Sequence, residues 1–306
     1  MAPDQDSSRM KPREGYVSTG QGRLYFRELG HGPPIIVLHG GPDFDHFYLL
    51  PEMDKLAESF RLIYYDQRGR GRSAEGTRPE DVTIQSEMDD LTMIQDHFGL
   101  ELSALLGHSF GGLLAMEYAT RHPERVSHLI LMNTAPGSHS DLLVFREHLH
   151  DLRTSEEKEL LQALASGPAF RQGDLSVESD LYRIHFRPAV HPTDLENLVA
   201  RLRKNFTEET VVLAREIEHR LNNETWDQEH YDLLPLLGRL KAPTLLIHGD
   251  RDFIPFGVAT RIVRAIPSST LSLLSDCGHF AYLERPDEVH RLIVELFTRS
   301  QPNASS

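Results

Sequence analysis

One short stretch of the chain combines a hydroxyl nucleophile with the glycines that would expose it. Residues 102–120 read as a short apolar strand, the turn Gly-His-Ser-Phe-Gly at 107–111, and an apolar helix. A G-x-S-x-G turn between strand and helix is typical of a nucleophile elbow, whose apex residue takes a strained backbone conformation and points its side chain outward. Small flanking residues let strand and helix approach closely. We therefore interpret Ser109 as a candidate nucleophile.

A serine hydroxyl is a poor nucleophile unless a base removes its proton during attack. Histidine suits this task because its unperturbed pKa of about 6.5 lies near neutral pH. Two late loops carry suitable groups, His-Gly-Asp-Arg-Asp at 248–252 and Asp-Cys-Gly-His-Phe at 276–280. Each follows a predicted parallel strand, as Ser109 does, and open α/β sheets bind their ligands at the carboxyl ends of such strands. We expect His279 to be the base.

A carboxylate is also needed to orient the histidine and to stabilise its charged form. Three aspartates in the two loops could supply it, namely Asp250, Asp252 and Asp276. Other histidines lie at predicted strand ends near the same edge, and we expect them to pack or to form hydrogen bonds around the site: His39, His108 and His248.

The elements that must position these groups follow from the hydrophobic pattern. A short β-branched run without a polar face predicts a buried central strand at 34–38, and further strands are predicted at 61–65, 126–132, 244–248 and 270–274, beside the elbow strand. A hairpin is predicted over 15–30 and a helix over 47–59. Residues 83–98 show helical spacing of apolar side chains, with Thr83 as a cap. The alternation predicts an α/β fold with a mostly parallel sheet and helices on both faces.

This alternation stops in the middle of the chain. The segment 138–232 is highly charged, helix-compatible and punctuated by X-Pro pairs, with no convincing buried strand. We interpret it as an inserted helical cap, or lid. The predicted α/β core then comprises residues 15–137 and 233–306, and residues 1–14 are expected to form a disordered tail.

Composition excludes several classes of function. The 306 residues carry a formal net charge of −14, which argues against binding nucleic acid or an anionic membrane surface. The single cysteine excludes an internal disulfide, and neither a signal peptide nor an apolar run of about 18 residues is visible. On one helix, His148 and His150 would lie on different faces, so we expect no metal there. The sequence predicts a soluble, cytoplasmic protein without a cofactor.

The chain order serine, acid, histidine resembles that of the α/β-hydrolase family, and the resemblance extends from about residue 15 to 300. It implies Ser109 as nucleophile and His279 as general base and then acid. The family spacing H-G-x-x-D, matched at 248–252, implies Asp252 as the orienting carboxylate.

The resemblance also implies how the site would stabilise a negatively charged intermediate. One oxyanion donor would be the backbone N–H of Phe110, directly after the nucleophile, and the other that of Gly41 in the loop His-Gly-Gly-Pro at 39–42. Four aromatic residues are candidates to line an acyl pocket, although core packing would explain them equally well: Phe44, Phe186, Trp226 and Phe253.

Two motifs, HGGP at 39–42 and DQRGRGRS at 66–73, resemble the proline iminopeptidase group, which removes N-terminal residues from small peptides. His108 departs from that group, whose elbow usually begins Gly-Gly-Ser, and Gly-His-Ser is common in esterases. We therefore expect a serine hydrolase that forms an acyl-enzyme with a small carboxylic ester or amide, with a lean to esters. A proline iminopeptidase-type aminopeptidase is the first alternative, and a non-catalytic small-molecule receptor of the same fold is the second.

The pocket between cap and sheet would discriminate between these substrates. An acidic closed end would indicate binding of a peptide amino terminus, whereas an apolar tunnel would indicate acyl chains. The resemblance implies that cap carboxylates hold the amino terminus, yet those of the cap fall in no motif, and an exposed helical face is their default interpretation: Glu208, Glu209, Glu216, Glu218 and Glu224. The oligomeric state is not predicted.

Overall fold

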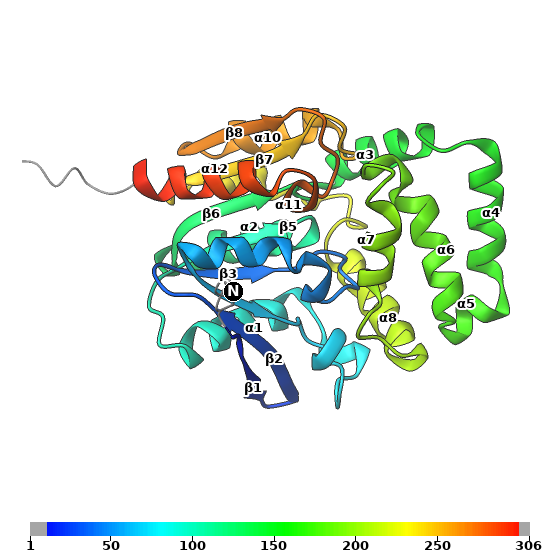
Figure 1. Cartoon of the computed structure of the whole chain (residues 1–306), viewed down its shortest axis with the longest axis horizontal. Helices are drawn as coiled ribbons and strands as arrows, with labels where there is room; N and C mark the ends of the chain where they lie inside the picture. Colours follow the sequence, from blue (N-terminus) through cyan, green and yellow to red (C-terminus); the bar gives the residue numbers. More distant parts are fainter. Residues whose placement is uncertain (1–10, 300–306) are drawn as a thin grey trace, which may run out of the picture.

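The computed structural model describes residues 11–299, and a single eight-stranded sheet forms its centre (Figure 1). The strand order is β1-β2-β4-β3-β5-β6-β7-β8. The hairpin β1–β2 and the pair β2–β4 are antiparallel, and every other neighbouring pair is parallel. The strands are β1 (Arg13–Thr19), β2 (Gly22–Leu29), β3 (Pro34–Leu38), β4 (Arg61–Tyr65), β5 (Ser103–His108), β6 (Val126–Met132), β7 (Thr244–Gly249) and β8 (Ser269–Leu274). The predicted α/β fold and mostly parallel sheet are confirmed.

Helices pack on both faces of this sheet (Figure 1). The helix α1 begins after Thr83, whose side chain accepts a hydrogen bond from the N–H of Ser86, while the Ser86 side chain accepts one from Thr83. This capping box satisfies two N–H groups that the first turn would leave unpaired. The helices of the core are α1 (Ile84–His97), α2 (Phe110–Arg121), α9 (Leu234–Leu237), α10 (Phe256–Ala265), α11 (Ala281–Glu284) and α12 (Pro286–Arg299).

Two of the predicted boundaries need correction. The helix expected over 47–59 consists of two 3-10 helices, η1 (His46–Leu49) and η2 (Glu52–Glu58), because Pro51 between them has no N–H to continue a helical ladder. The tail expected over 1–14 extends too far, since β1 begins at Arg13. The rest of that tail, residues 1–10, lies outside the described residues.

The segment proposed as a cap lies beside the core, over one edge of the sheet (Figure 1). An isolated β-bridge joins Ser138 to Asp232, so the two ends of the segment 138–232 meet. Between them lie α3 (His139–Asp151), α4 (Ser155–Ser166), α5 (Pro168–Gln172), α6 (Leu175–Phe186), α7 (Leu195–Leu202) and α8 (Glu208–Glu224). We refer to residues 138–232 as the proposed cap.

The parallel strands all direct their carboxyl ends to the edge of the sheet that the proposed cap covers (Figure 1). The loops after β3, β5, β6, β7 and β8 therefore meet there, and they contain every site residue predicted from the core. No helix within residues 11–299 is long and apolar enough to cross a membrane.

Candidate active site

Ser109 occupies the sharp turn between β5 and α2. Its backbone has φ 54° and ψ −120°, a conformation that L-residues rarely adopt. The turn is fixed by hydrogen bonds from Ser109 N to the carbonyl of Met132 (3.1 Å) and from Ala135 N to the carbonyl of Ser109 (3.0 Å). A side chain at Gly107 would place its Cβ 2.2 Å from the carbonyl oxygen of Gly111, so glycine is required there. The sequence pattern thus produces the expected strained apex.

His279 and Asp252 lie together at the same sheet edge. The Nδ1 atom of the histidine is 2.9 Å from Oδ1 of the aspartate, and both side chains are buried. Burial by itself would raise the pKa of Asp252, but the nearby imidazoles of His279 and His248 and two hydrogen bonds hold that pKa well below its usual range. Asp252 is therefore an anion at neutral pH, and it orients His279 so that Nε2 remains for a hydroxyl partner.

The other two aspartates have different partners. Asp250 accepts a hydrogen bond from the N–H of Cys277 at 3.0 Å and so connects the two loops. Asp276 is exposed and pairs with Arg251 and Arg285. Of the three candidate aspartates in the two loops, Asp252 is the one that contacts the His279 side chain.

Asn133 is a site residue that the sequence reasoning missed. Its Nδ2 donates to Oδ2 of Asp252 at 2.8 Å and to the carbonyl of Gly278 at 3.0 Å. It also has a positive φ of 47°, which asparagine tolerates better than most residues. Asn133 follows β6 directly, at the same edge of the sheet, so its position after a predicted parallel strand was the available signal.

The two predicted oxyanion donors flank the apex. Phe110 is the first residue of α2, and neither its N–H nor that of Gly41 forms a hydrogen bond with another residue in the described range 11–299. Gly41 has a φ of 122°, and a Cβ there would lie 2.1 Å from the N atom of Asp43. The bend at Gly41 therefore depends on the absence of a side chain.

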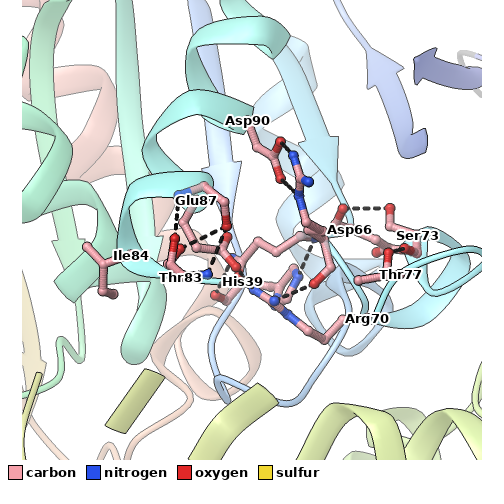
Figure 2. Close-up of polar contacts among 12 residues, drawn as sticks. His39, Asp66, Arg70, Ser73, Thr77, Thr83, Ile84, Glu87 and Asp90 are labelled. Atoms are coloured by element: carbon pink, nitrogen blue, oxygen red, sulfur yellow. Dashed lines mark hydrogen bonds and ion pairs between the residues drawn. The ribbon is translucent and has the colours of Figure 1, made fainter. Parts of the chain in front are cut away.

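A buried polar cluster behind the loop 39–42 contains Gln67 and Arg70 of the motif at 66–73, together with His39 and Glu87 (Figure 2). The backbone N–H of Gln67 donates to His39 Nε2 (3.1 Å), and its side-chain Nε2 donates to the His39 carbonyl (3.0 Å). Arg70 donates in turn to Gln67 Oε1 at 2.7 Å and pairs with Glu87 at 2.6 Å, and both charged groups are fully buried. Through Gln67 the ion pair is connected to both the ring and the carbonyl of His39, at the start of the glycine loop, while Arg70 Nε and Glu87 Oε2 have no hydrogen-bond partner within residues 11–299.

A cavity of about 330 Å³ between core and proposed cap contains Ser109, His279 and Gly41 in its wall. All four aromatic residues predicted for the pocket line it: Phe44, Phe186, Trp226 and Phe253. The Phe110 ring lies outside this wall and packs edge-on against Trp226 at 5.4 Å, while Asp252 lies behind His279. No group of three or more His, Cys, Asp or Glu side chains within residues 11–299 is arranged to hold a metal ion.

One part of the cavity wall is charged. Arg203 pairs with the carboxylates of Asp43 and, at 3.3 Å, Glu178, and Arg215 lies 3.4 Å from the other oxygen of Glu178. Glu218 also lines the cavity, and within the range 11–299 it forms no hydrogen bond or close ion pair, although the charges of Arg203 and Arg215 partly offset the rise in its pKa. When all of these groups are ionised, the three carboxylates carry one more negative charge than the positive charges of Arg203 and Arg215 can balance.

Burial, followed by repulsion from Asp43 and Glu178, raises the pKa of Glu218 to about 8. The default interpretation of the cap carboxylates as an exposed face is therefore wrong for Glu218, although Glu208, Glu209, Glu216 and Glu224 are exposed. Sequence reasoning did not single out Asp43 or Glu178.

Comparison with known proteins agrees with this geometry. The family model described as alpha/beta hydrolase fold matches residues 33–286. A proline iminopeptidase of Lactobacillus helveticus is 30% identical over 286 residues, covering 89% of this chain and 92% of that protein. A proline iminopeptidase of Clostridium botulinum is 28% identical over 285 residues, covering 91% and 96%. The solved structure of a proline iminopeptidase from Mycobacterium smegmatis superposes with a TM-score of 0.70 at 23% identity, covering 94% of this chain and 98% of that one.

Proposed function

Because the chain belongs to the α/β-hydrolase family, we propose that it is a serine hydrolase that removes the N-terminal residue from short peptides, as a proline iminopeptidase-type aminopeptidase. The observation that carries this proposal is the unpaired Glu218 carboxylate in the wall of the cavity that contains Ser109. Relatives named for this activity favour it over the ester substrates that the Gly-His-Ser elbow suggests.

Glu218 provides the feature that an ester hydrolase would not need. The α-amino group of a peptide is a cation, and it requires an anionic partner when it leaves water. Asp43 and Glu178 already have arginine partners, so Glu218 is the carboxylate that a substrate ammonium would neutralise. The aromatic walls of the same cavity suit the apolar ring of an N-terminal proline.

In the proposed mechanism, Ser109 Oγ attacks the carbonyl carbon of the N-terminal residue while His279 Nε2 takes the hydroxyl proton. Asp252 stabilises the resulting imidazolium, and the N–H groups of Phe110 and Gly41 stabilise the negatively charged oxygen of the tetrahedral intermediate. His279 then gives its proton to the departing amine as the peptide bond breaks, leaving the residue esterified to the serine. Water, deprotonated by His279, attacks that ester and releases the free amino acid.

The test compares three substrates with the whole protein: a prolyl-arylamide, its N-acetylated counterpart and a short-chain aryl ester. We expect acetylation to lower kcat/KM at least about 30-fold, since a hydrogen bond to a charged group contributes about 2 kcal/mol. Ser109→Ala serves as the inactive control, together with a fluorophosphonate probe that labels serine nucleophiles.

Each alternative has a distinct outcome in this test. Turnover of the ester that exceeds that of the prolyl-arylamide, with no effect of acetylation, would identify an ester hydrolase. A folded protein that turns over none of the three substrates and is not labelled at Ser109 would favour a receptor.

A further inference from the structure

Two hollows in this protein share part of one wall. The first is the cavity that contains Ser109, and the second is an outer pocket of about 710 Å³ on the proposed cap, formed mainly by α5 and α8. Phe170, Arg215 and Glu218 line both. These three side chains therefore separate the catalytic cavity from the outer pocket, and we refer to them as the partition.

Contacts of Arg215 hold the partition together. Its guanidinium carbon lies 3.8 Å from the centre of the Phe170 ring, a cation–π arrangement, and Nη2 donates to the Phe170 carbonyl at 2.7 Å. On its other side, Nη1 lies 3.4 Å from Oε1 of Glu178. Arg215 thus connects the aromatic part of the partition to the charged wall of the cavity.

The Phe170 side of the partition has little other support. Helix α5 has five residues, and none of them is buried. The Phe170 ring is only half-buried, and the stack on Arg215 is a specific contact that holds it in the wall. The partition is a thin barrier between two spaces rather than a part of the hydrophobic core.

We propose that the Phe170–Arg215 stack closes the acyl end of the catalytic cavity and limits the acyl part of the substrate to a single residue. This inference rests on the proposed function, since the ammonium group of that residue would meet Glu218 at the partition. A longer acyl part has to pass the stack and extend into the outer pocket. Phe170 is accordingly a residue that determines specificity for acyl length.

Phe170→Ala is the sharpest test, because it removes the ring but keeps the backbone carbonyl that Arg215 also contacts. Phe170→Tyr is the matched control, since it preserves an aromatic face for the guanidinium. Val212→Ala is a second control, because Val212 lines only the outer pocket. The measurement is the ratio of kcat/KM for a dipeptidyl-arylamide to that for the prolyl-arylamide.

We expect Phe170→Ala to raise this ratio at least about tenfold, in line with the discrimination that a change of pocket volume supplies. Both controls should leave the ratio unchanged. Because the ratio compares two substrates on one protein, a partial loss of folded enzyme cancels. An unchanged ratio in a folded Phe170→Ala variant would overturn the proposal, and Phe170→Leu repeats the test if the alanine variant does not fold.

A parallel series separates this inference from the proposed function. If neither arylamide is turned over, the aminopeptidase proposal fails, but aryl esters of increasing acyl length still probe the partition. Phe170→Ala should then extend the longest acyl chain that is hydrolysed. Fluorophosphonates with short and long alkyl chains give the same comparison by labelling Ser109 without turnover. A protein that reacts with no substrate and no probe would overturn both proposals.

Discussion

His108 Nε2 lies 2.9 Å from the carbonyl oxygen of His279, so the residue before the candidate nucleophile holds the backbone of the candidate base. On the other side of the ring, Nδ1 lies 2.7 Å from the hydroxyl of Tyr48, which accepts a hydrogen bond from the N–H of Gly40. The Tyr48 hydroxyl therefore donates its own hydrogen to His108 Nδ1, and the Nε2–H group of His108 donates to the carbonyl oxygen of His279. Burial lowers the pKa of His108 to about 3, so the ring is neutral, as this chain of hydrogen bonds requires.

This relation predicts that His108 acts as a positioning residue. His108→Gly, which creates the Gly-Gly-Ser form, leaves the His279 carbonyl and the Tyr48 hydroxyl without their partner. We expect kcat to fall about tenfold or more, since an unpaired buried polar group costs about 1 to 3 kcal/mol, with little change in KM. His108→Gln can replace both hydrogen bonds and should recover part of kcat. A folded His108→Gly variant with normal kcat would contradict this role.

A second prediction concerns the strained backbone of Ser109. Ser109→Gly and Ser109→Ala both remove the hydroxyl, but only glycine adopts φ 54° and ψ −120° without a steric cost. Such strain costs about 1 to 3 kcal/mol, and the greater freedom of glycine in the unfolded chain offsets about 0.5 to 1 kcal/mol of the gain.

We therefore expect the glycine variant to exceed the alanine variant by about 1 kcal/mol in its free energy of unfolding, measured by urea denaturation. Both variants should lose hydrolysis and fluorophosphonate labelling. Equal stability of the two variants would show that the strain at the apex does not exceed the cost of glycine's freedom in the unfolded chain, about 0.5 to 1 kcal/mol.

The sheet and the residues at its carboxyl edge were predictable because their signals are local. The run Pro34–Leu38 has no polar face, so it can only be a strand covered on both sides. The turn around Ser109 and the loop containing His279 each follow a predicted parallel strand, and parallel pairing brings the carboxyl ends of these strands to one edge of the sheet. The fold, the nucleophile and the base follow from these strands, whereas the choice of Asp252 over Asp250 and Asp276 depended on the family spacing H-G-x-x-D.

The charged wall of the cavity could not be predicted in the same way. Glu178 lies on α6 and Glu218 on α8, and their meeting with Asp43 depends on how the cap helices pack. On α8, Glu218 lines the cavity whereas Glu216, two residues earlier, is exposed, and the sequence around them does not distinguish the two. From the sequence, the lean to esters rested on His108 in the elbow, because the charged wall that supports a peptide substrate forms only when the cap helices pack.

The final prediction is a pH dependence that follows from Glu218. Its pKa of about 8 means that the carboxyl is mostly protonated in the free protein at neutral pH. Pairing with a substrate ammonium requires the ionised form, so binding releases a proton and tightens as pH rises towards about 8. The KM for a prolyl-arylamide should therefore fall between about pH 6 and 8, and it should rise again where the substrate amine loses its proton.

Glu218→Gln separates this effect from pH effects on the catalytic step, which act on every substrate. We expect the variant to have a high KM for the prolyl-arylamide that no longer falls with pH, while the N-acetylated substrate or an aryl ester is little affected.

The stability of the protein gives an independent measurement of the raised pKa. The folded-state pKa of Glu218 lies above the ordinary glutamate value of 4.5, so between these two pH values the native state retains a proton that the unfolded chain has lost, and the free energy of unfolding falls as pH rises. Glu218→Gln should remove this loss and gain stability relative to wild type at alkaline pH, and equal pH profiles of unfolding would contradict the raised pKa.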